Sequence, residues 1–173
     1  WTDKNSISTE VELGLRFRAA KDRSFVSLLW WNTSPNGFEL AFEYMDDGCW
    51  TDLGDPSKRE KNLVILSGVL RAIQRLHDDY SMAHYDIKPS NVLLDRHGRV
   101  ALSDFGCASP ECARCSTRMY SYTSVQTGRC EQRSPMYDLY AAGMILLEIL
   151  RPDRFRYMRN PFHFSENDAS VMK

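Results

Sequence analysis

The chain has 173 residues, which is enough for one domain and too few for two complete ones. Its hydrophobic fraction of 43% and aromatic fraction of 12% are typical of a globular protein with a packed core, not of a disordered tail. The formal net charge of −1 provides no overall field that would attract nucleic acid or an anionic membrane.

Neither a membrane span nor an export signal is visible in the sequence. No apolar run approaches the roughly 20 residues that cross a bilayer, and the polar start WTDKNSISTEVE has no apolar signal-peptide region. We therefore expect an intracellular, cytoplasmic protein without a membrane segment. Because the first residue is not Met, we also expect the chain to be a fragment of a longer protein.

The first predicted element is a helix over residues 8–20, where apolar residues recur at helical intervals and Ser8 or Thr9 is a plausible N-cap. The runs 24–31 and 38–45 are short and rich in β-forming residues. The Asn-Thr-Ser-Pro-Asn-Gly sequence between them is strong turn chemistry, so we predict an antiparallel hairpin.

A polar connector over residues 46–60, with one short helical turn, precedes the clearest element of the sequence, a long amphipathic helix over 61–80. Its predicted core-facing stripe consists of Leu63, Leu66, Leu70, Ile73 and Leu76. The runs NVLLD and RVALSD around Arg-His-Gly then predict a second small hairpin.

The remainder of the chain is predicted from composition and periodicity. Residues 107–134 show no periodicity and are assigned to a loop, and 138–150 read as a helix that is apolar nearly all round and therefore buried. To the polar and aromatic residues 152–173 we assign no structure.

The stretch HYDIKPSNVLLD, residues 84–95, lies between the long helix and the second hairpin and carries three polar residues at close offsets, Asp86, Lys88 and Asn91. Asp104 follows thirteen residues after Asn91, in SDFGCAS. Polar residues at such offsets, with apolar runs between them, describe a site that holds a metal, a phosphate and a hydroxyl together.

This arrangement resembles the eukaryotic protein kinase family from about residue 8 to 150, and the motif of Asp, Lys and Asn followed by Asp-Phe-Gly is highly specific. The resemblance implies an α+β, protein-kinase-like bilobal fold, with a partial β-rich N-lobe over residues 1–45 and a partial, mainly helical C-lobe over 46–173. It also implies a protein serine/threonine kinase that transfers the γ-phosphate of Mg-ATP to a protein hydroxyl, since Lys88 at this offset resembles the serine/threonine class.

The same resemblance assigns the catalytic and metal roles. Asp86 would accept or orient the proton of the attacking hydroxyl, and Lys88 would neutralise the transferring phosphate. Asn91 and Asp104 would supply oxygen ligands to Mg²⁺, a hard cation that prefers oxygen.

The nucleotide site follows from the segment AFEYM, which looks like the kinase hinge. Phe42 would be the gatekeeper, the backbone of Glu43 and Met45 would bond the adenine edge, and Leu93 would form the apolar floor under the base. For Phe42 and Leu93 a plain core role is equally compatible.

Supporting residues are also assigned by resemblance. Glu10 looks like the helix glutamate that pairs with the ATP-binding lysine; Glu12 is the alternative, and either could belong to a solvated helix face. His84 and Phe105 look like packing residues between the catalytic and metal loops, and Asp138 looks like a buried brace for the catalytic loop.

Several departures from the family pattern keep a second function open, a catalytically dead, pseudokinase-like binding module. Tyr85 stands where many kinases have Arg, and Tyr-Thr-Ser at 122–124 replaces Ala-Pro-Glu. A Gly-rich phosphate loop is not present in the sequence. The strand lysine is also missing, because Lys4 is only six residues before Glu10 and too close to form the lysine–glutamate pair.

The five cysteines are Cys49, Cys107, Cys112, Cys115 and Cys130. Without secretory context they are interpreted as reduced thiols. The Cys-x4-Cys-x2-Cys spacing at 107–115 could bind zinc, but no second pair or His stands at finger-like spacing, so a zinc site is disfavoured.

Overall fold

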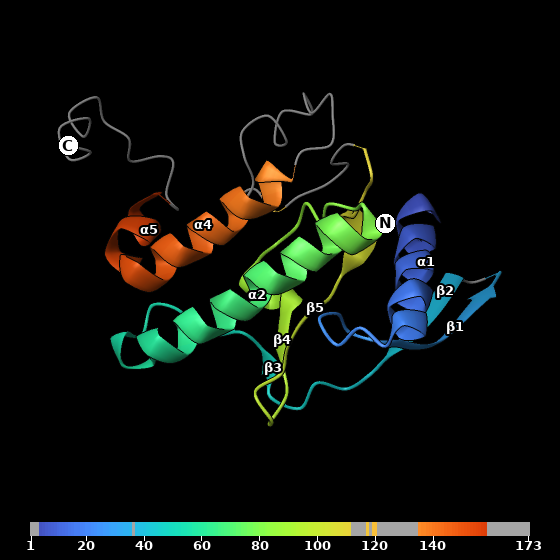
Figure 1. The fold of residues 1–173 in the computed structure, drawn as a ribbon, viewed down its shortest axis with the longest axis horizontal. Helices are drawn as coiled ribbons and strands as arrows, with labels where there is room; N and C mark the ends of the chain where they lie inside the picture. The colour runs from blue at the N-terminus through green and yellow to red at the C-terminus, as the bar shows by residue number, and fades with distance from the viewer. Residues whose placement is uncertain (1–3, 36, 112–116, 118, 121–134, 159–173) are drawn as a thin grey trace.

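The computed structural model describes residues 4–35, 37–111, 117, 119–120 and 135–158 (Figure 1). In chain order the elements are α1 Lys4–Ala20, β1 Leu28–Ser34, β2 Gly37–Phe42, β3 Gly48–Cys49, η1 Pro56–Lys58, α2 Arg59–Tyr80, η2 Pro89–Asn91, β4 Val92–Leu94, β5 Val100–Leu102, η3 Phe105–Cys107, α4 Met136–Leu150 and α5 Pro152–Met158. The fold is α+β, as predicted.

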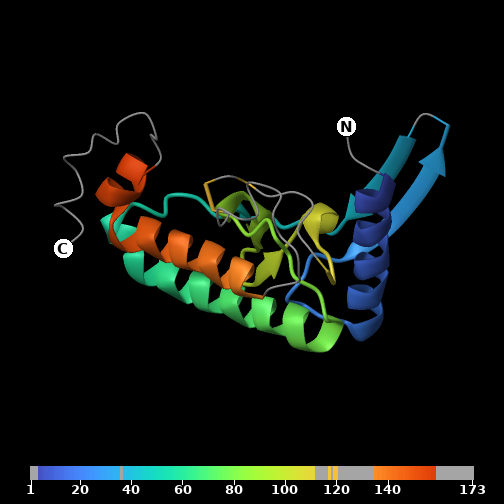
Figure 2. The same ribbon diagram turned by 90° about the horizontal axis from the view of Figure 1, so that it is seen from above.

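The elements form two groups. Helix α1 and the β1–β2 hairpin lie at one end of the molecule, and α2, α4 and α5 lie at the other (Figures 1 and 2). Helices α2 and α4 run side by side, and the small antiparallel sheet β3–β4–β5 packs on α2 through β5. None of the described helices is long and apolar enough to cross a membrane.

Helix α1 is confirmed, but it begins earlier than predicted. Because it starts at Lys4, Ser8 and Thr9 lie inside the helix and neither is its N-cap. Leu13 and Phe17 are almost fully buried on one face of the helix, as helical periodicity requires.

The first predicted hairpin is also confirmed, with a register that runs from Leu28 opposite Phe42 to Ser34 opposite Gly37. Strand β1 therefore continues through residues 32–34, which the sequence had assigned to the turn. Just before β1, Phe25 bridges to Leu102, so the chain leading into the hairpin is hydrogen-bonded to β5.

The long helix α2 is present, but its predicted buried stripe is only partly right. Leu63 and Leu70 are 39% and 41% exposed, whereas Leu66, Ile73 and Leu76 are buried. The buried residues are Asn62, Ile65, Leu66, Val69, Ala72, Ile73, Leu76 and Tyr80. The reason is that α2 packs on β5 and on α4 at once, which widens the buried face beyond a single 3–4 stripe.

A cluster of four aromatic rings joins the two groups of elements. Phe17 of α1 stacks on Phe25 with centroids 4.0 Å apart, and it contacts Tyr80 of α2 at 4.8 Å and Phe105 at 4.9 Å. Aromatic pairs in such tilted and edge-to-face arrangements contribute beyond their buried area. The position of α1 is therefore linked to the segment that carries Asp104.

The C-terminal predictions need two corrections. Helix α4 is present, but Leu139, Leu146 and Leu150 are exposed, so it is not buried all round. Residues 152–158, to which no structure was assigned, form helix α5. The second hairpin, β4–β5, is confirmed.

Much of the predicted loop 107–134 lies outside the described residues, as do Cys112, Cys115 and Cys130. Cys107 is disulfide-bonded, so the prediction that all thiols are reduced is wrong at this position. Cys49 is free and exposed.

Two helix-interior glycines provide a test of the packing of α1. A Cβ at Gly14 would lie 2.7 Å from the Leu28 Cβ, whereas a Cβ at Gly143 of α4 would meet nothing within 4 Å. We expect Gly14→Ala to lower the free energy of unfolding by about 1–3 kcal/mol through overpacking. Gly143→Ala, the matched control, should raise it by about 0.5–1 kcal/mol through helix propensity. Urea unfolding of both variants measures the difference, and equal effects would contradict the close approach of α1 to β1.

Candidate active site

The site is built on a loop that a buried carboxylate holds in place. Asp138, in the first turn of α4, is fully buried and accepts the backbone N–H groups of His84 and Tyr85, each at 2.8 Å. The Nε2 atom of His77 lies 2.7 Å from the same carboxylate. The predicted brace is thus present in the geometry, and it joins α2, α4 and the loop.

The other side of the loop is tied to the segment before Asp104. The imidazole of His84 is buried, with Nε2 3.1 Å from the Ser103 carbonyl oxygen and its ring 5.0 Å from that of Phe105. Ser103 donates its N–H to the Asn91 carbonyl at 2.9 Å. His84 therefore contacts Ser103 and Phe105, as a packing residue between the two loops would.

Asp86, Lys88 and Thr117 form a closed triangle of hydrogen bonds. The Lys88 Nζ lies 2.6 Å from Asp86 Oδ2 and 2.8 Å from Thr117 Oγ1, and the Thr117 N–H donates to Asp86 Oδ1 at 2.6 Å. Burial opposes ionisation of Asp86, but the bonds from Lys88 and Thr117 outweigh it and hold its pKa below the ordinary value. Asp86 is therefore a carboxylate at neutral pH.

Asn91 and Asp104 offer oxygen donors next to this triangle. The Asn91 Nδ2 donates to the Asp86 carbonyl at 3.0 Å, and its amide oxygen has no partner among the described residues. Asp104 is exposed in a left-handed conformation with φ 63°, and its carboxylate has no hydrogen-bond or ion-pair partner in the described part of the chain. An amide and a carboxylate oxygen fit Mg²⁺, which takes few protein ligands and completes its shell with phosphates and water.

Glu10 of α1 lies near Asp104. Burial and the charge of Asp104 raise its pKa to about 7, against the hydrogen bond it accepts from the Phe105 N–H. No cation pairs with Glu10 among the described residues, and the Lys4 side chain is outside them. The alternative glutamate, Glu12, is exposed.

The predicted hinge residues gather around a small apolar cluster. Phe42 and Leu93 are half-buried and pack against Val26, Met45 and Ala101. Among the described residues no backbone N–H donates to the Glu43 carbonyl. The Met45 N–H likewise donates to no backbone carbonyl there. These are the groups that would face an adenine edge.

An ion pair that the sequence did not indicate fixes this hinge. The Arg99 guanidinium makes two bonds to the Glu43 carboxylate, at 2.7 and 2.8 Å, and the same carboxylate accepts the Ser27 N–H at 2.7 Å. The bonds from Arg99 lower the pKa of Glu43 although burial opposes this. A separation of 56 residues leaves no local signal that could have revealed the pair.

Two further contacts also escaped the sequence reasoning. No role was assigned to Thr117 above, and its bonds to Asp86 and Lys88 were not predicted. Tyr85, in the place of the family's Arg, donates its hydroxyl to the Glu111 carbonyl at 2.9 Å, and its ring lies 5.9 Å from that of Tyr137. A neutral hydrogen bond and ring packing thus hold the segment that follows the Asp-Phe-Gly motif.

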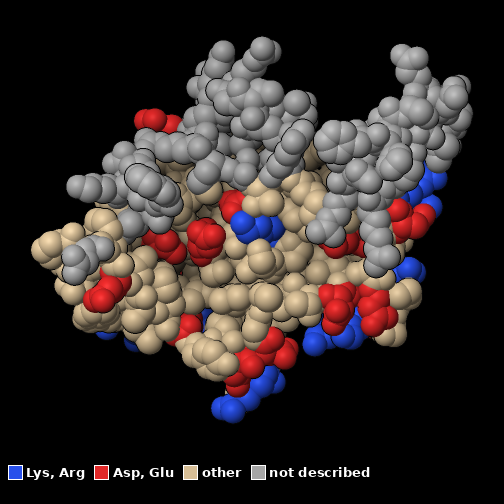
Figure 3. All heavy atoms as spheres, turned by 180° about the vertical axis from the view of Figure 1, so that it is seen from behind, with Lys and Arg blue, Asp and Glu red and all other residues tan. Residues whose placement is uncertain are grey.

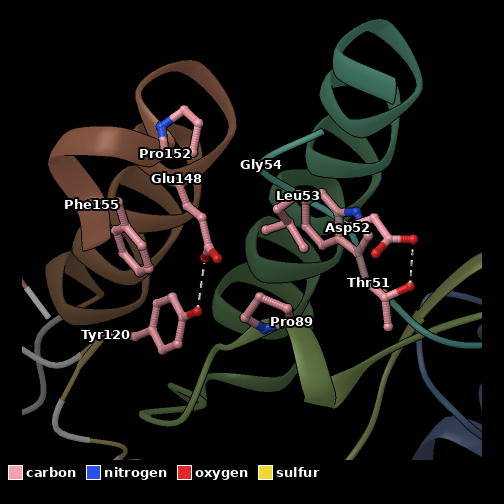
Figure 4. Close-up of a pocket in the computed structure, with 10 residues that line it drawn as sticks. Thr51, Asp52, Leu53, Gly54, Pro89, Tyr120, Glu148, Pro152 and Phe155 are labelled. Atoms are coloured by element: carbon pink, nitrogen blue, oxygen red, sulfur yellow. Dashed lines mark hydrogen bonds between the residues drawn. The ribbon is translucent and has the colours of Figure 1, made fainter. Parts of the chain in front are cut away.

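A pocket of about 380 Å³ opens beside the catalytic loop (Figure 4). It is bordered by Pro89 of the loop, by the connector before α2 and by residues of α4 and α5. Tyr120 points its hydroxyl at Glu148 with a 2.9 Å bond, and its ring lies 5.8 Å from that of Phe155. The contact between Tyr120 and α4 anchors the part of the chain that also carries Thr117.

Comparisons with known proteins agree with this geometry. The family described as "Protein kinase domain" matches residues 1–169. The chain is 31% identical over 156 residues to the LRR receptor-like serine/threonine-protein kinase ERECTA of Arabidopsis thaliana, covering 82% of this chain and 16% of that protein. It is 33% identical over 144 residues to LRR receptor-like serine/threonine-protein kinase SIK1 of Oryza sativa subsp. japonica, covering 75% and 15%.

A third relative comes from a different group. The mitogen-activated protein kinase kinase 1c of Physcomitrium patens is 36% identical over 120 residues, covering 63% of this chain and 34% of that protein. The chain thus spans well under half the length of each of these relatives.

The brace can be tested by Asp138→Asn, which keeps the shape but presents an amide NH₂ to a backbone N–H. We expect the free energy of unfolding to fall by about 2–3 kcal/mol, because a buried donor loses its acceptor. Asp153→Asn, in the first turn of α5 and mostly exposed, is the matched control and should change it by less than about 0.5 kcal/mol. Similar losses in both variants, measured by urea unfolding, would rule out a special role for Asp138.

The raised pKa of Glu10 predicts a pH dependence of stability. The unfolded carboxyl ionises near 4.5 and the folded one near 7, so the contribution of Glu10 to stability falls as the pH rises from about 5 to 8. A shift of this size corresponds to about 3 kcal/mol, and we expect about 2 because the side chain keeps contact with solvent.

The measurement is the unfolding free energy of Glu10→Gln relative to the unmodified chain at pH 5 and pH 8, where the variant should gain stability only at the higher pH. Glu12→Gln removes the same charge from the exposed face of α1. If both variants gained equally, the dependence would come from the charge of the helix and not from the surroundings of Glu10.

Proposed function

Because the chain belongs to the protein kinase family, we propose that it is a protein serine/threonine kinase that transfers the γ-phosphate of ATP to a hydroxyl of a protein substrate. The observation that carries the proposal is the triangle of Asp86, Lys88 and Thr117, with an ionised Asp86 beside the oxygen donors of Asn91 and Asp104.

In this proposal Asp86 orients the substrate hydroxyl and accepts its proton. Its low pKa keeps it ionised, and its short bond to Lys88 places a positive charge where the transferring phosphate needs one. Thr117 holds both side chains in position. The residue types are those that the serine/threonine class uses, since Lys88 stands two positions after the aspartate.

Asn91 and Asp104 would hold Mg²⁺ through their side-chain oxygens. When bound, the metal neutralises charge on the phosphates of ATP. The chain's own contribution is to fix Asn91 through its bond to the Asp86 backbone and to hold Asp104 in an exposed, unpaired state.

The adenine would lie against Phe42 and Leu93, with the Glu43 carbonyl and the Met45 N–H as its hydrogen-bonding edge. The ion pair between Glu43 and Arg99 supports this assignment, because it stiffens the backbone that carries both groups. The boundary between the two lobes, at residues 45 and 46, is part of the same proposal.

One observation favours a second function, a pseudokinase-like binding module. Glu10 has no cationic partner among the described residues and lies beside Asp104 with a raised pKa. In an active kinase, the corresponding glutamate pairs with the ATP-binding lysine.

The test is magnesium-dependent transfer of phosphate from labelled ATP to a generic serine/threonine substrate. We expect Asp104→Ala to reduce transfer at least a hundredfold, because it removes a metal ligand. Asp78→Ala, on the exposed face of α2, is the control and should leave transfer unchanged. The same variants are also made in the full-length protein. If the folded full-length protein transfers phosphate no faster than its Asp104→Ala variant, the binding-module function replaces the enzyme; an active full-length protein beside an inactive chain means only that the chain holds part of the nucleotide site.

A further inference from the structure

A hollow outside the candidate active site gathers basic side chains. It has a volume of about 570 Å³ and lies between the end of α1, the loop 21–24, the middle of α2 and the turn before β5. Its charged residues, here called the basic hollow, are Lys21, Asp22, Arg23, Arg71, Arg75 and Arg99. Five cations and one carboxylate thus line one concavity of a chain whose net charge is −1.

Two of these cations stabilise the fold through ion pairs and hydrogen bonds. Arg99 is bound to Glu43 and to the carbonyls of Arg23 and Phe25, and its side chain is only 12% exposed. Arg75 lies 2.8 Å from Asp22 and 3.3 Å from Asp79. Their charges are therefore compensated by neighbouring carboxylates.

The other three cations have no carboxylate partner in the part of the chain that the structure describes. Among the described residues Lys21 and Arg23 have no side-chain partner, and Arg71 bonds only the neutral hydroxyl of Ser67, at 2.8 Å. Asp22, the one carboxylate of the hollow, already accepts three hydrogen bonds. They come from the Arg75 guanidinium, the Ser24 N–H and the Tyr80 hydroxyl. The basic hollow thus has a surplus of three positive charges.

This surplus differs from the charge distribution over the described residues on the one face that Figure 3 shows. On the face shown in Figure 3, acidic and basic side chains are intermixed over the described residues. Cations brought together without carboxylates repel each other, so their proximity costs stability unless an anion binds between them.

The backbone around the hollow is fixed before any ligand binds. Lys21 is left-handed, with φ 52°, and its N–H bonds the Arg18 carbonyl, while the Arg23 carbonyl accepts from Arg99 Nε at 2.9 Å. The N–H of Asp22 likewise bonds Phe17 at 3.0 Å. Cations carried by a fixed backbone bind with less loss of conformational entropy.

Two glycines keep the hollow open. At Gly68 of α2 a Cβ would lie 3.0 Å from Val100, so a side chain there would separate α2 from β5. Gly98 has φ 79° and nothing within 4 Å of its Cβ position. The lining therefore carries no side chain at these two positions.

We propose that the basic hollow is a docking site for a phosphoserine or phosphothreonine side chain of a partner peptide, recognised by Arg71, Arg23 and Lys21. Guanidinium groups bind phosphate oxygens through paired, charge-assisted bonds, and a phosphomonoester brings almost two negative charges to the three free cations. A volume of about 570 Å³ admits a phosphorylated side chain with its neighbours. A duplex or a membrane surface would engage a basic patch that extends well beyond one hollow, because its charges are spread along the whole polymer or bilayer.

The test is fluorescence anisotropy with a labelled peptide that carries one phosphoserine among neutral residues, titrated with the whole chain. We expect saturable binding that weakens with salt, and no binding of the unphosphorylated peptide. Arg71→Gln should weaken binding about tenfold, and Arg71→Gln combined with Arg23→Gln should reduce it beyond detection. Arg59→Gln, which removes a cation from the same helix outside the hollow, should leave the affinity unchanged.

The other outcomes would overturn the proposal. Equal binding of phosphorylated and unphosphorylated peptides, or equal effects of Arg71→Gln and Arg59→Gln, would mean that the cations are only a solvated surface. Competition by inorganic phosphate as strong as that by the phosphopeptide would assign the hollow to free phosphate. Unfolding curves of each variant show that it is folded, and the binding readout is independent of phosphate transfer.

Discussion

The buried carboxylate of Asp138 is the constraint on which the candidate site depends. It has no contact with solvent, and a charge in that position is tolerated only because three donors reach it, from His84, Tyr85 and His77. Those donors come from the catalytic loop and from α2. The loop that carries Asp86 therefore keeps its shape only while α2 and α4 stay packed together, so the packing of the helices and the chemistry of the site cannot vary separately.

The aromatic cluster extends this dependence to α1. Phe105 touches His84 on one side and Phe17 of α1 on the other, so the segment that carries Asp104 lies between the loop and the helix. Glu10 is placed by the same packing, which brings its carboxyl close to Asp104. Burial of the Glu10 carboxyl and, after it, the negative charge of Asp104 raise the pKa of Glu10, since no cation of the described residues lies between the two groups.

What could be predicted from the sequence was local. Turn chemistry and alternation predicted both hairpins correctly. The roles of Asp86, Lys88, Asn91 and Asp104 came from the family resemblance and stay predictions, although the first three are joined by hydrogen bonds in the structure. The N-cap predicted at Ser8 or Thr9 and the burial predicted for Leu63 and Leu70 were wrong, because helix starts and buried faces depend on neighbours distant in the chain. The bond between Glu43 and Arg99 has no local signature for the same reason.

The positively charged side chains of the chain have three different roles, and the groups around each cation decide which role it has. Where a carboxylate lies within bonding distance, as for Arg99, the cation stiffens the fold. Lys88 also has a carboxylate partner, Asp86, but its side chain is only partly buried, so in the proposed function its charge stays available to the transferring phosphate. Among the described residues Arg71 has no carboxylate partner, and Asp22 in the same hollow is bonded to Arg75 instead. The availability of a cation for a ligand is thus decided by competition among cations for few buried carboxylates, and it cannot be inferred from net charge.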